Sequence, residues 1–215
     1  MVSKIIGIIS YMPDDEEIRK ARYSILLQLL DTCYRFNVPI MIIAQNWNKE
    51  ELNNLNDKVI LKTYPKLGIT GARKELRKQF LASNFDYLIM LDDDCKIKAT
   101  DKGIAAYLHK IDLHPGGVGE FRSTLLKLYA ISKEIFSQVD YEDINPESGE
   151  GFEDTIFVNK VRNKFHNRVF SFQISSADLL EMSKVSKDTL STWYIDQNLP
   201  VMLKKTHDLI DKKFK

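Results

Sequence analysis

Three consecutive carboxylates, Asp92, Asp93 and Asp94, follow directly on the apolar run 87–91. Acids packed this closely repel one another and raise one another's pKa values unless a cation lies between them. In open α/β sheets the ligand crevice lies just beyond the carboxyl ends of the strands. The sequence therefore predicts a site for Mn²⁺ or Mg²⁺ at a strand end, because these hard cations prefer oxygen ligands.

A second candidate is the stretch 68–76, where Gly68 and Gly71 interrupt the chain before an amphipathic helix. Arg73 falls in the first turn of that helix, where a cation opposes the helix dipole. An anion bound at the helix start would remove the conflict. A solvated basic face balanced by Glu75 explains the same pattern, and both interpretations stay open.

A third candidate is the pair Glu153 and Asp154, which follows the acidic, turn-rich segment 140–151. The pair opens an amphipathic helix that runs to about residue 165. Acidic residues are common in a first helical turn, so the pair alone indicates a helix start more than a catalytic site.

The elements that must position these residues begin at the N-terminus. Short β-branched runs alternate with helical patterns. Strands are predicted over 4–10, 38–44 and 59–62, and the helices between them over 14–33 and 49–56. This order predicts an α/β fold with a Rossmann-like nucleotide-binding half, in which helices flank a mostly parallel central sheet. The chain contains neither a Gly-x-Gly-x-x-Gly nor a Gly-x-x-x-x-Gly-Lys loop, which disfavours the dinucleotide-binding and P-loop classes.

After residue 94 the pattern predicts a polar stretch over 95–102, a helix over 103–110 and a turn over 114–119. A strand over 125–131, a helix over 132–136 that starts at Ser132, and a last strand over 168–174 follow. Beyond this the periodicity fades and the end is rich in lysine. We expect a catalytic domain over residues 1–175 and a helical C-terminal appendage over 176–215.

The bulk composition is that of an ordinary globular protein, with 215 residues and a formal net charge of +1. The near-neutral charge indicates no polyanionic partner, so a nucleic acid acceptor stays open but is not favoured. Cys33 and Cys95 have no metal-binding spacing, and no signal peptide or transmembrane segment is evident. We expect a cytoplasmic protein that could act at the membrane surface, and nothing in the sequence indicates its oligomeric state.

Together and in this order, the motifs at 68–74, 85–94 and 151–154 resemble those of the GT-A glycosyltransferases, and of the family 2 type most of all. That family has a Gly-x-Ser-x-Ala-Arg-Asn stretch, an apolar run into Asp-x-Asp, and a later Glu-Asp. The resemblance extends from about residue 4 to residue 165. It implies a GT-A fold and a metal-dependent transfer of a sugar from a nucleotide-sugar donor.

The resemblance also implies roles for individual residues. Asp94 would bind the metal, and Asp92 would contact the ribose or a metal-bound water. Asp154 would be the catalytic base, with Glu153 beside it contacting the acceptor. The residues expected at the donor nucleotide are Tyr11, Asn46, Gly71, Arg73, Asp92 and Asp93, of which Asp93 is the variable position of Asp-x-Asp and not a third metal ligand.

Two departures from the family pattern limit these expectations. Gln45 and Asn46 stand where many members have an acidic residue that reads the nucleobase, so a UDP-sugar is the expected donor but the base stays open. Neither His166 nor His207 can be assigned as a further metal ligand. The acceptor would be a saccharide, lipid-linked or other hydroxyl, attacked with inversion.

Three other classes of protein share part of this sequence pattern. A nucleotidyltransferase of the sugar-nucleotide pyrophosphorylase type shares the nucleotide-binding half, but usually has a Gly-rich basic loop after the first strand, which residues 11–15 do not provide. A HAD-type phosphohydrolase has its Asp-x-Asp after the first strand. A non-catalytic nucleotide-sugar-binding protein would not need Asp92, Asp94 and Asp154 together.

Overall fold

The computed structural model describes residues 1–53, 55, 57–120, 128–142, 153–171 and 180–184. The strands are β1 Lys4–Tyr11, β2 Ile40–Gln45, β3 Val59–Tyr64, β4 Tyr87–Asp92, β5 Cys95–Ala99, β6 Val118–Glu120, β7 Leu128–Ser132, β8 Val169–Ser171 and β9 Leu180–Lys184. The helices are α1 Glu16–Tyr34, α2 Lys49–Asn53, α3 Gly68–Ala82, α4 Asp101–Asp112, α5 Lys133–Ser137 and α6 Glu153–Phe165, followed by the short 3-10 turn His166–Arg168.

Seven strands form the central sheet in the order β3-β2-β1-β4-β7-β6-β8. The four strands β3, β2, β1 and β4 are parallel to one another, whereas β7 runs antiparallel to both β4 and β6. A second sheet of two strands joins β5 to β9. The α/β class predicted from the sequence, with a mostly parallel sheet flanked by helices, is confirmed.

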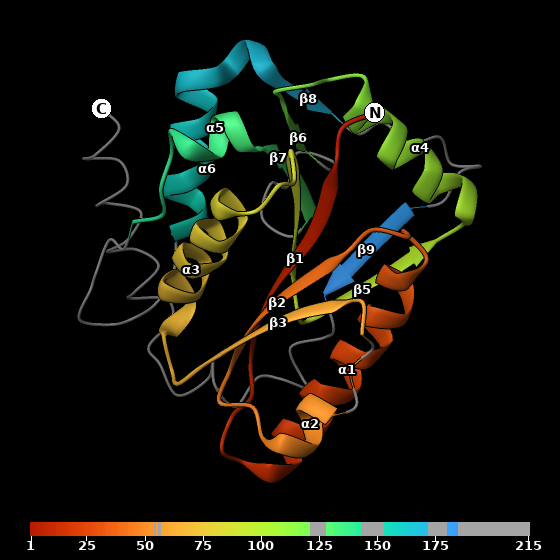
Figure 1. The fold of residues 1–215 in the computed structure, drawn as a ribbon, viewed down its shortest axis with the longest axis vertical. Coiled ribbons are helices and arrows are strands. Elements are labelled where there is room, and N and C mark those ends of the chain that lie inside the picture. The colour runs from red at the N-terminus through yellow and green to blue at the C-terminus, as the bar shows by residue number, and fades with distance from the viewer. Residues whose placement is uncertain (54, 56, 121–127, 143–152, 172–179, 185–215) are drawn as a thin grey trace.

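The two faces of the central sheet carry separate apolar cores. On one face α1, α4 and β5 pack against alternate residues of β1, β2 and β4, such as Ile6, Ile42 and Ile89. On the other face α3, α5 and α6 pack against the intervening residues, such as Ile5 and Leu88. Figure 1 shows these two groups of elements on opposite sides of the sheet. Because both faces are covered, the inner parallel strands β1, β2 and β4 are buried and apolar along most of their length.

The helix starts follow ordinary capping chemistry. Asp15 and Thr100 accept hydrogen bonds from the backbone N–H groups of Ile18 and Gly103, at the starts of α1 and α4. Ser132 caps α5, as its position before that helix predicts. The start of α3 differs, because its N-cap Leu67 offers no side-chain acceptor.

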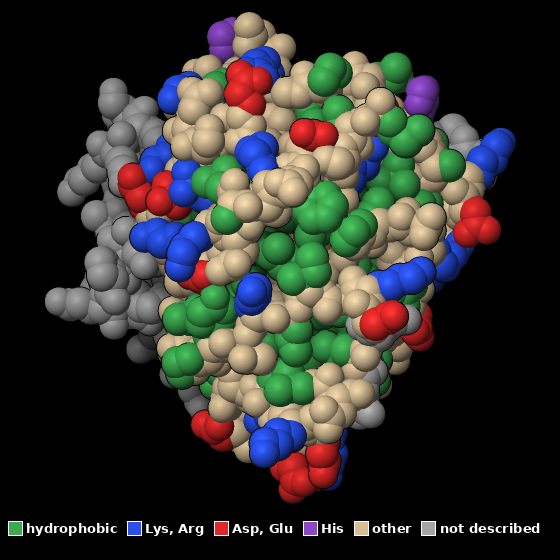
Figure 2. Space-filling view, viewed as in Figure 1, with side chains coloured by type: hydrophobic (Ala, Val, Ile, Leu, Met, Phe, Trp, Pro, Cys, Tyr) green, Lys and Arg blue, Asp and Glu red, His purple; other side chains and the backbone are tan. Residues whose placement is uncertain are grey.

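The edge of the sheet is formed by β3. Its residues alternate in exposure, and Ile60 and Lys62 face solvent. Figure 2 shows apolar side chains across the face of the molecule on which β3 lies. An exposed lysine on an edge strand disfavours pairing with a further strand.

Three strands were not predicted from the sequence. The segment 95–99 was expected to be polar and irregular, but it forms β5 and packs against α1. Its partner β9 lies within the range expected to be a helical appendage, and the structure places residues 180–184 in a strand. The third is β6, which has only three residues. Residues 185–215 lie outside the described part, so the expected division at residue 175 stays a prediction.

Among the described residues, no helix is both long and apolar enough to cross a membrane.

Candidate functional site

The carboxyl ends of β1 to β4 meet at one edge of the sheet. Ile9 of β1 pairs with Asp92 of β4, and Tyr11, two residues later, pairs with Gln45 of β2. Gln45 in turn pairs with Tyr64 of β3. The fold therefore brings the end of the Asp-rich strand, the loop after β1 and the start of α3 to one side of the molecule.

Arg73 of α3 and Asp92 of β4 form an ion pair at this edge. The Nη2 of Arg73 lies 3.3 Å from Oδ1 of Asp92, and only 4% of the Arg73 side chain is exposed. Its guanidinium carbon also lies 5.7 Å from the ring centroid of Tyr141. A charged group in the interior is costly unless it is paired. The burial excludes the solvated basic face that the sequence left open for Arg73.

Asp93 faces the opposite side of the sheet. Its Oδ2 accepts a hydrogen bond from Ser10 Oγ at 2.7 Å, and its Oδ1 accepts one from Arg22 Nη2 at 2.9 Å. Asp92, the last residue of β4, therefore contacts α3, whereas Asp93, in the turn that follows, contacts β1 and α1. These contacts give Asp93 a structural role in anchoring the turn after β4 to α1.

Asp94 is half-buried in the turn between β4 and β5, and the thiol of Cys95 lies 3.8 Å from its Oδ1. Among the described residues no group of three acidic, histidine or cysteine side chains could hold a metal ion. Mg²⁺ at phosphate sites is usually held by one or two carboxylates, with substrate phosphates and water completing its shell. Asp92 and Asp94 fit that kind of site, and they do not fit a closed protein cage.

Asn46 has a positive φ of 57° directly after β2. Asparagine is among the residues that tolerate this left-handed region best. Its side-chain amide donates at 2.8 Å to the carbonyl oxygen of Met12 and to Oδ1 of Asp14. Asn46 thus fixes the loop after β1, whether or not it also contacts a nucleotide.

The same loop is held by a buried ion pair between α1 and α2. Arg19 donates to both carboxylate oxygens of Glu51, at 2.7 and 2.8 Å, and to the carbonyl oxygen of Asn46 at 2.6 Å. The hydrogen bond from Arg19 to Glu51 is also the main reason why the pKa of Arg19 is raised. Arg19, which also donates to the carbonyl oxygen of Pro13 in this loop, is therefore already neutralised by Glu51.

The start of α3 is fixed from β2. The buried side chain of Gln45 accepts a hydrogen bond from the backbone N–H of Leu67 at 2.8 Å. Gly68 follows with a positive φ of 71°. A Cβ on Gly71 would lie 3.2 Å from Cβ of Leu67, so the first turn packs closely there. Lys66 lies beside this helix start, with its Nζ 5.7 Å from the ring centroid of Tyr11.

An aromatic cluster joins this edge to α6. It consists of Tyr129, Phe136, Tyr141 and Phe157, and the Tyr141 ring stacks on Phe157 with centroids 4.4 Å apart. The hydroxyl groups of Tyr129 and Tyr141 form a hydrogen bond. Burial, reinforced by the neighbouring Tyr141, raises the pKa of Tyr129 well above its ordinary value. The Tyr129 hydroxyl therefore stays protonated at neutral pH.

Glu153 and Asp154 occupy the first turn of α6. Phe157, one turn later, contacts Tyr129, and Tyr129 pairs with Met90 of β4. The second turn of α6 thus packs against β7 at the level of Met90, two residues before Asp92. The side chains of Glu153 and Asp154 lie outside the described part, and so does most of the acidic segment that precedes them.

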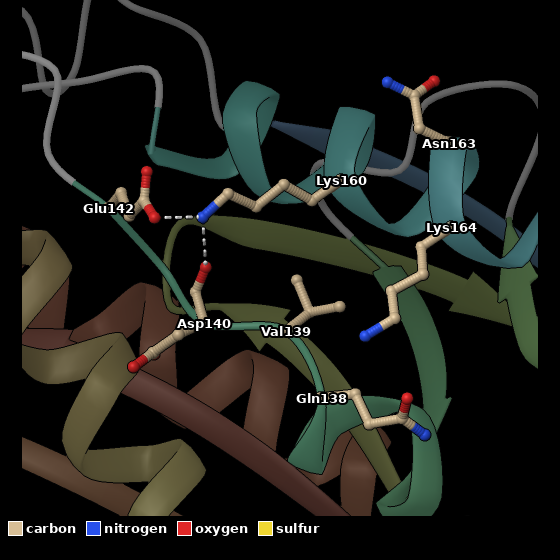
Figure 3. Close-up of a pocket in the computed structure, with 7 residues that line it drawn as sticks. All are labelled: Gln138, Val139, Asp140, Glu142, Lys160, Asn163 and Lys164. Carbon is tan, nitrogen blue, oxygen red and sulfur yellow. Dashed lines mark hydrogen bonds and ion pairs between the residues drawn. The ribbon is translucent and has the colours of Figure 1, made fainter.

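A hollow of about 650 Å³ lies between the chain after α5 and the second half of α6 (Figure 3). It is lined by Gln138, Val139, Asp140, Glu142, Lys160, Asn163 and Lys164. Lys160 spans it, with Nζ 2.5 Å from Oε1 of Glu142 and 3.5 Å from the carbonyl oxygen of Asp140. None of the residues predicted for the site lines this hollow.

Sequence reasoning missed four residues that organise the candidate site: Ser10, Arg22, Tyr129 and Tyr141. The partner of Asp93, Arg22, could not be read from the sequence, because it is fixed by how α1 docks on the sheet. Neither tyrosine carries a local signal of its role. Tyr141 lies in a segment that the pattern indicated to be a loop, and Tyr129 lies in an ordinary predicted strand.

The sequence matches no protein-family model and no curated protein. Its structure is similar to that of a Bacillus anthracis protein described as a glucose-1-phosphate thymidylyltransferase and solved with sucrose. That match has 13% identity and a TM-score of 0.60, over 91% of this chain and 97% of the other. Staphylococcus aureus TarS matches with 13% identity and a TM-score of 0.59, over 87% of this chain and 37% of TarS.

A third similar structure is a Desulfovibrio desulfuricans G20 protein described as a nucleotide-diphospho-sugar transferase. It matches with 11% identity and a TM-score of 0.56, over 100% of this chain and 99% of the other. The fold is therefore that of the nucleotide-diphospho-sugar transferases. At these identities the likeness establishes the fold, and the activity must be argued from the site.

Proposed function

We propose that the protein is a metal-dependent glycosyltransferase that moves a sugar from a nucleotide-sugar donor, with a UDP-sugar as the expected donor, to an acceptor hydroxyl. The observation that carries this proposal is the buried Arg73–Asp92 pair, which lies at the carboxyl edge of the sheet beside Asp94. A buried cation next to two carboxylates suits a diphosphate that shares a divalent cation with them.

In this proposal Asp92 and Asp94 hold Mn²⁺ or Mg²⁺, which would serve as a Lewis acid for the departing diphosphate. Arg73 stabilises the same negative charge from the α3 side, together with the uncapped first turn at Gly71. Asp93 fixes the turn that carries both acids through its contacts with Ser10 and Arg22.

Asp154 is proposed as the general base that takes the proton from the attacking acceptor hydroxyl, with Glu153 contacting the acceptor. Its placement in the first turn of α6, near the end of β4, supports this role. Attack on the face of the sugar opposite the diphosphate inverts the anomeric centre. Tyr11 and Asn46 lie where the nucleoside would bind, beyond the ends of β1 and β2.

Nucleotidyl transfer is the second candidate, favoured by the match to the Bacillus anthracis protein. That reaction places a triphosphate against the loop after the first strand. Here residues 12–15 contain no lysine or arginine, and the arginine that contacts the loop, Arg19, is paired with Glu51. This loop offers little charge to hold a triphosphate, so glycosyl transfer is the better supported reaction.

The acceptor is proposed as a saccharide or lipid-linked hydroxyl, reached in the cytoplasm or from a membrane surface.

The test is release of the nucleoside diphosphate. The protein is incubated with UDP-sugars and Mn²⁺, and UDP release by slow donor hydrolysis is measured. We expect Asp94→Ala to lose metal-dependent donor binding, and Asp154→Ala to bind the donor without turnover. Asp31→Ala, on the exposed face of α1, is the matched control and should behave like the wild type. No release from any nucleotide sugar, together with no metal-dependent nucleotide binding, would overturn the proposal.

A further inference from the structure

The geometry around Arg73 points to a positioning residue that the sequence motifs do not contain. We propose that Tyr141 holds the Arg73 guanidinium toward the donor diphosphate and ties it to α6, the helix that carries Asp154. This inference rests on the proposed function, since it concerns the arginine assigned to the diphosphate.

The ring of Tyr141 is held on several sides. It is 1% exposed, stacks on Phe157 of α6 at an interplanar angle of 22°, and meets Phe136 of α5 edge-on at 85°. Its hydroxyl is bonded to that of Tyr129 on β7. Neighbours from three elements therefore fix the ring, which makes it a stable support for another group.

The group it supports is Arg73, whose guanidinium carbon lies 5.7 Å from the ring centroid. The face of an aromatic ring carries partial negative charge and attracts a cation that lies within about 6 Å of the ring centroid. The contact with Asp92 is made at one guanidinium nitrogen, at 3.3 Å. Because Asp92 is also assigned to the donor and metal, the contact with Tyr141 is one that Arg73 can keep when Asp92 engages them.

The position of Tyr141 also connects the two halves of the site. One contact of its ring reaches Arg73 on α3, the donor side, and another reaches Phe157, which follows Asp154 by three residues on α6. A shift of this ring would therefore move the arginine and the helix of the proposed base relative to each other.

The test is a double-mutant cycle on the binding of UDP with Mn²⁺, followed by calorimetry. Tyr141→Leu removes the aromatic face and should weaken UDP binding by about 3- to 30-fold. In an Arg73→Met background the same change should alter the affinity by less than about twofold, because the partner is gone. Tyr141→Phe keeps the aromatic ring, so its UDP affinity should be close to that of the wild type. Tyr141→Met gives the same comparison if the leucine variant does not fold.

The matched control is Phe36→Leu, which removes an aromatic ring from the core on the other face of the sheet. It should lower stability without changing UDP affinity. Two outcomes would overturn the role of Tyr141 and leave the proposed function standing. One is an equal effect of Tyr141→Leu on UDP affinity in the wild-type and Arg73→Met backgrounds. The other is an unchanged UDP affinity in Tyr141→Leu when Arg73→Met weakens binding. Failure of the wild type to bind UDP, GDP or TDP with Mn²⁺ would overturn the proposed function, and this inference with it.

Discussion

The three consecutive acids are predicted to have separable roles, which substitution can distinguish. Asp93→Ala removes the carboxylate that accepts hydrogen bonds from Ser10 and Arg22. Ser10 is buried, whereas the Arg22 side chain is 26% exposed and can be rehydrated. A hydrogen bond to a charged group contributes about 1.5 to 3 kcal/mol, and part of the Arg22 contribution is recovered from water. We therefore expect a loss of about 2 to 4 kcal/mol in the free energy of unfolding.

For a domain of this size each kcal/mol lowers Tm by about 2 to 4 °C, so Asp93→Ala should unfold about 4 to 16 °C below the wild type. Asp94→Ala should stay within about 2 °C of the wild type and lose metal-dependent nucleotide binding instead. Thermal unfolding by circular dichroism measures both. An Asp93→Ala protein as stable as the wild type, or an Asp94→Ala protein destabilised to the same extent, would refute this division of roles.

Three further outcomes are expected. The pKa of Glu75 is lowered by hydrogen bonds from Gln79 and Tyr64, so its ionised form stabilises the fold. Glu75→Gln should thus lower the urea midpoint at neutral pH. The difference in midpoint between wild type and variant should vanish as the pH falls below the ordinary pKa of 4.5 and through the lowered pKa of Glu75. An equal difference in acid would contradict this. Asn46→Ala should be less stable than Asn46→Gly by about 1 to 2 kcal/mol in urea titration, because only glycine relieves the positive φ, and equal stabilities would exclude strain there. Burial raises the pKa of the Cys33 thiol to about 12, so a thiol reagent should label it only on unfolding, and rapid labelling of the native protein would contradict its burial.

The parallel half of the sheet could be predicted because its signals are local. Apolar runs rich in isoleucine, such as those in β1 and β2, are long enough to be buried on both faces, and intervening helical patterns dictate parallel order. β5 was missed because its sequence alternates cysteine, lysine, isoleucine and lysine, which looks polar when taken alone. Its pairing with β9, more than eighty positions later, is set by tertiary contacts that no local pattern carries.

The site was predictable in part for the same reason. The strand end at Asp92 and the helix start at Gly68 are local features, and parallel topology brings such ends to one edge. The contact between Arg73 and Asp92 followed from that topology. The contacts of Asp93 and Tyr141 did not, because they depend on how α1 and α6 dock on the two faces of the sheet.

The central claim is that the carboxyl edge at Asp92 and Asp94 holds a nucleoside diphosphate together with a divalent cation. A calorimetric titration of UDP, GDP and TDP, with and without Mn²⁺, tests it most directly. We predict that at least one of the three binds only when Mn²⁺ is present, that Asp94→Ala abolishes this binding, and that Asp31→Ala leaves it intact. Absence of binding by the wild type, or binding that is indifferent to both Mn²⁺ and Asp94→Ala, would contradict the claim.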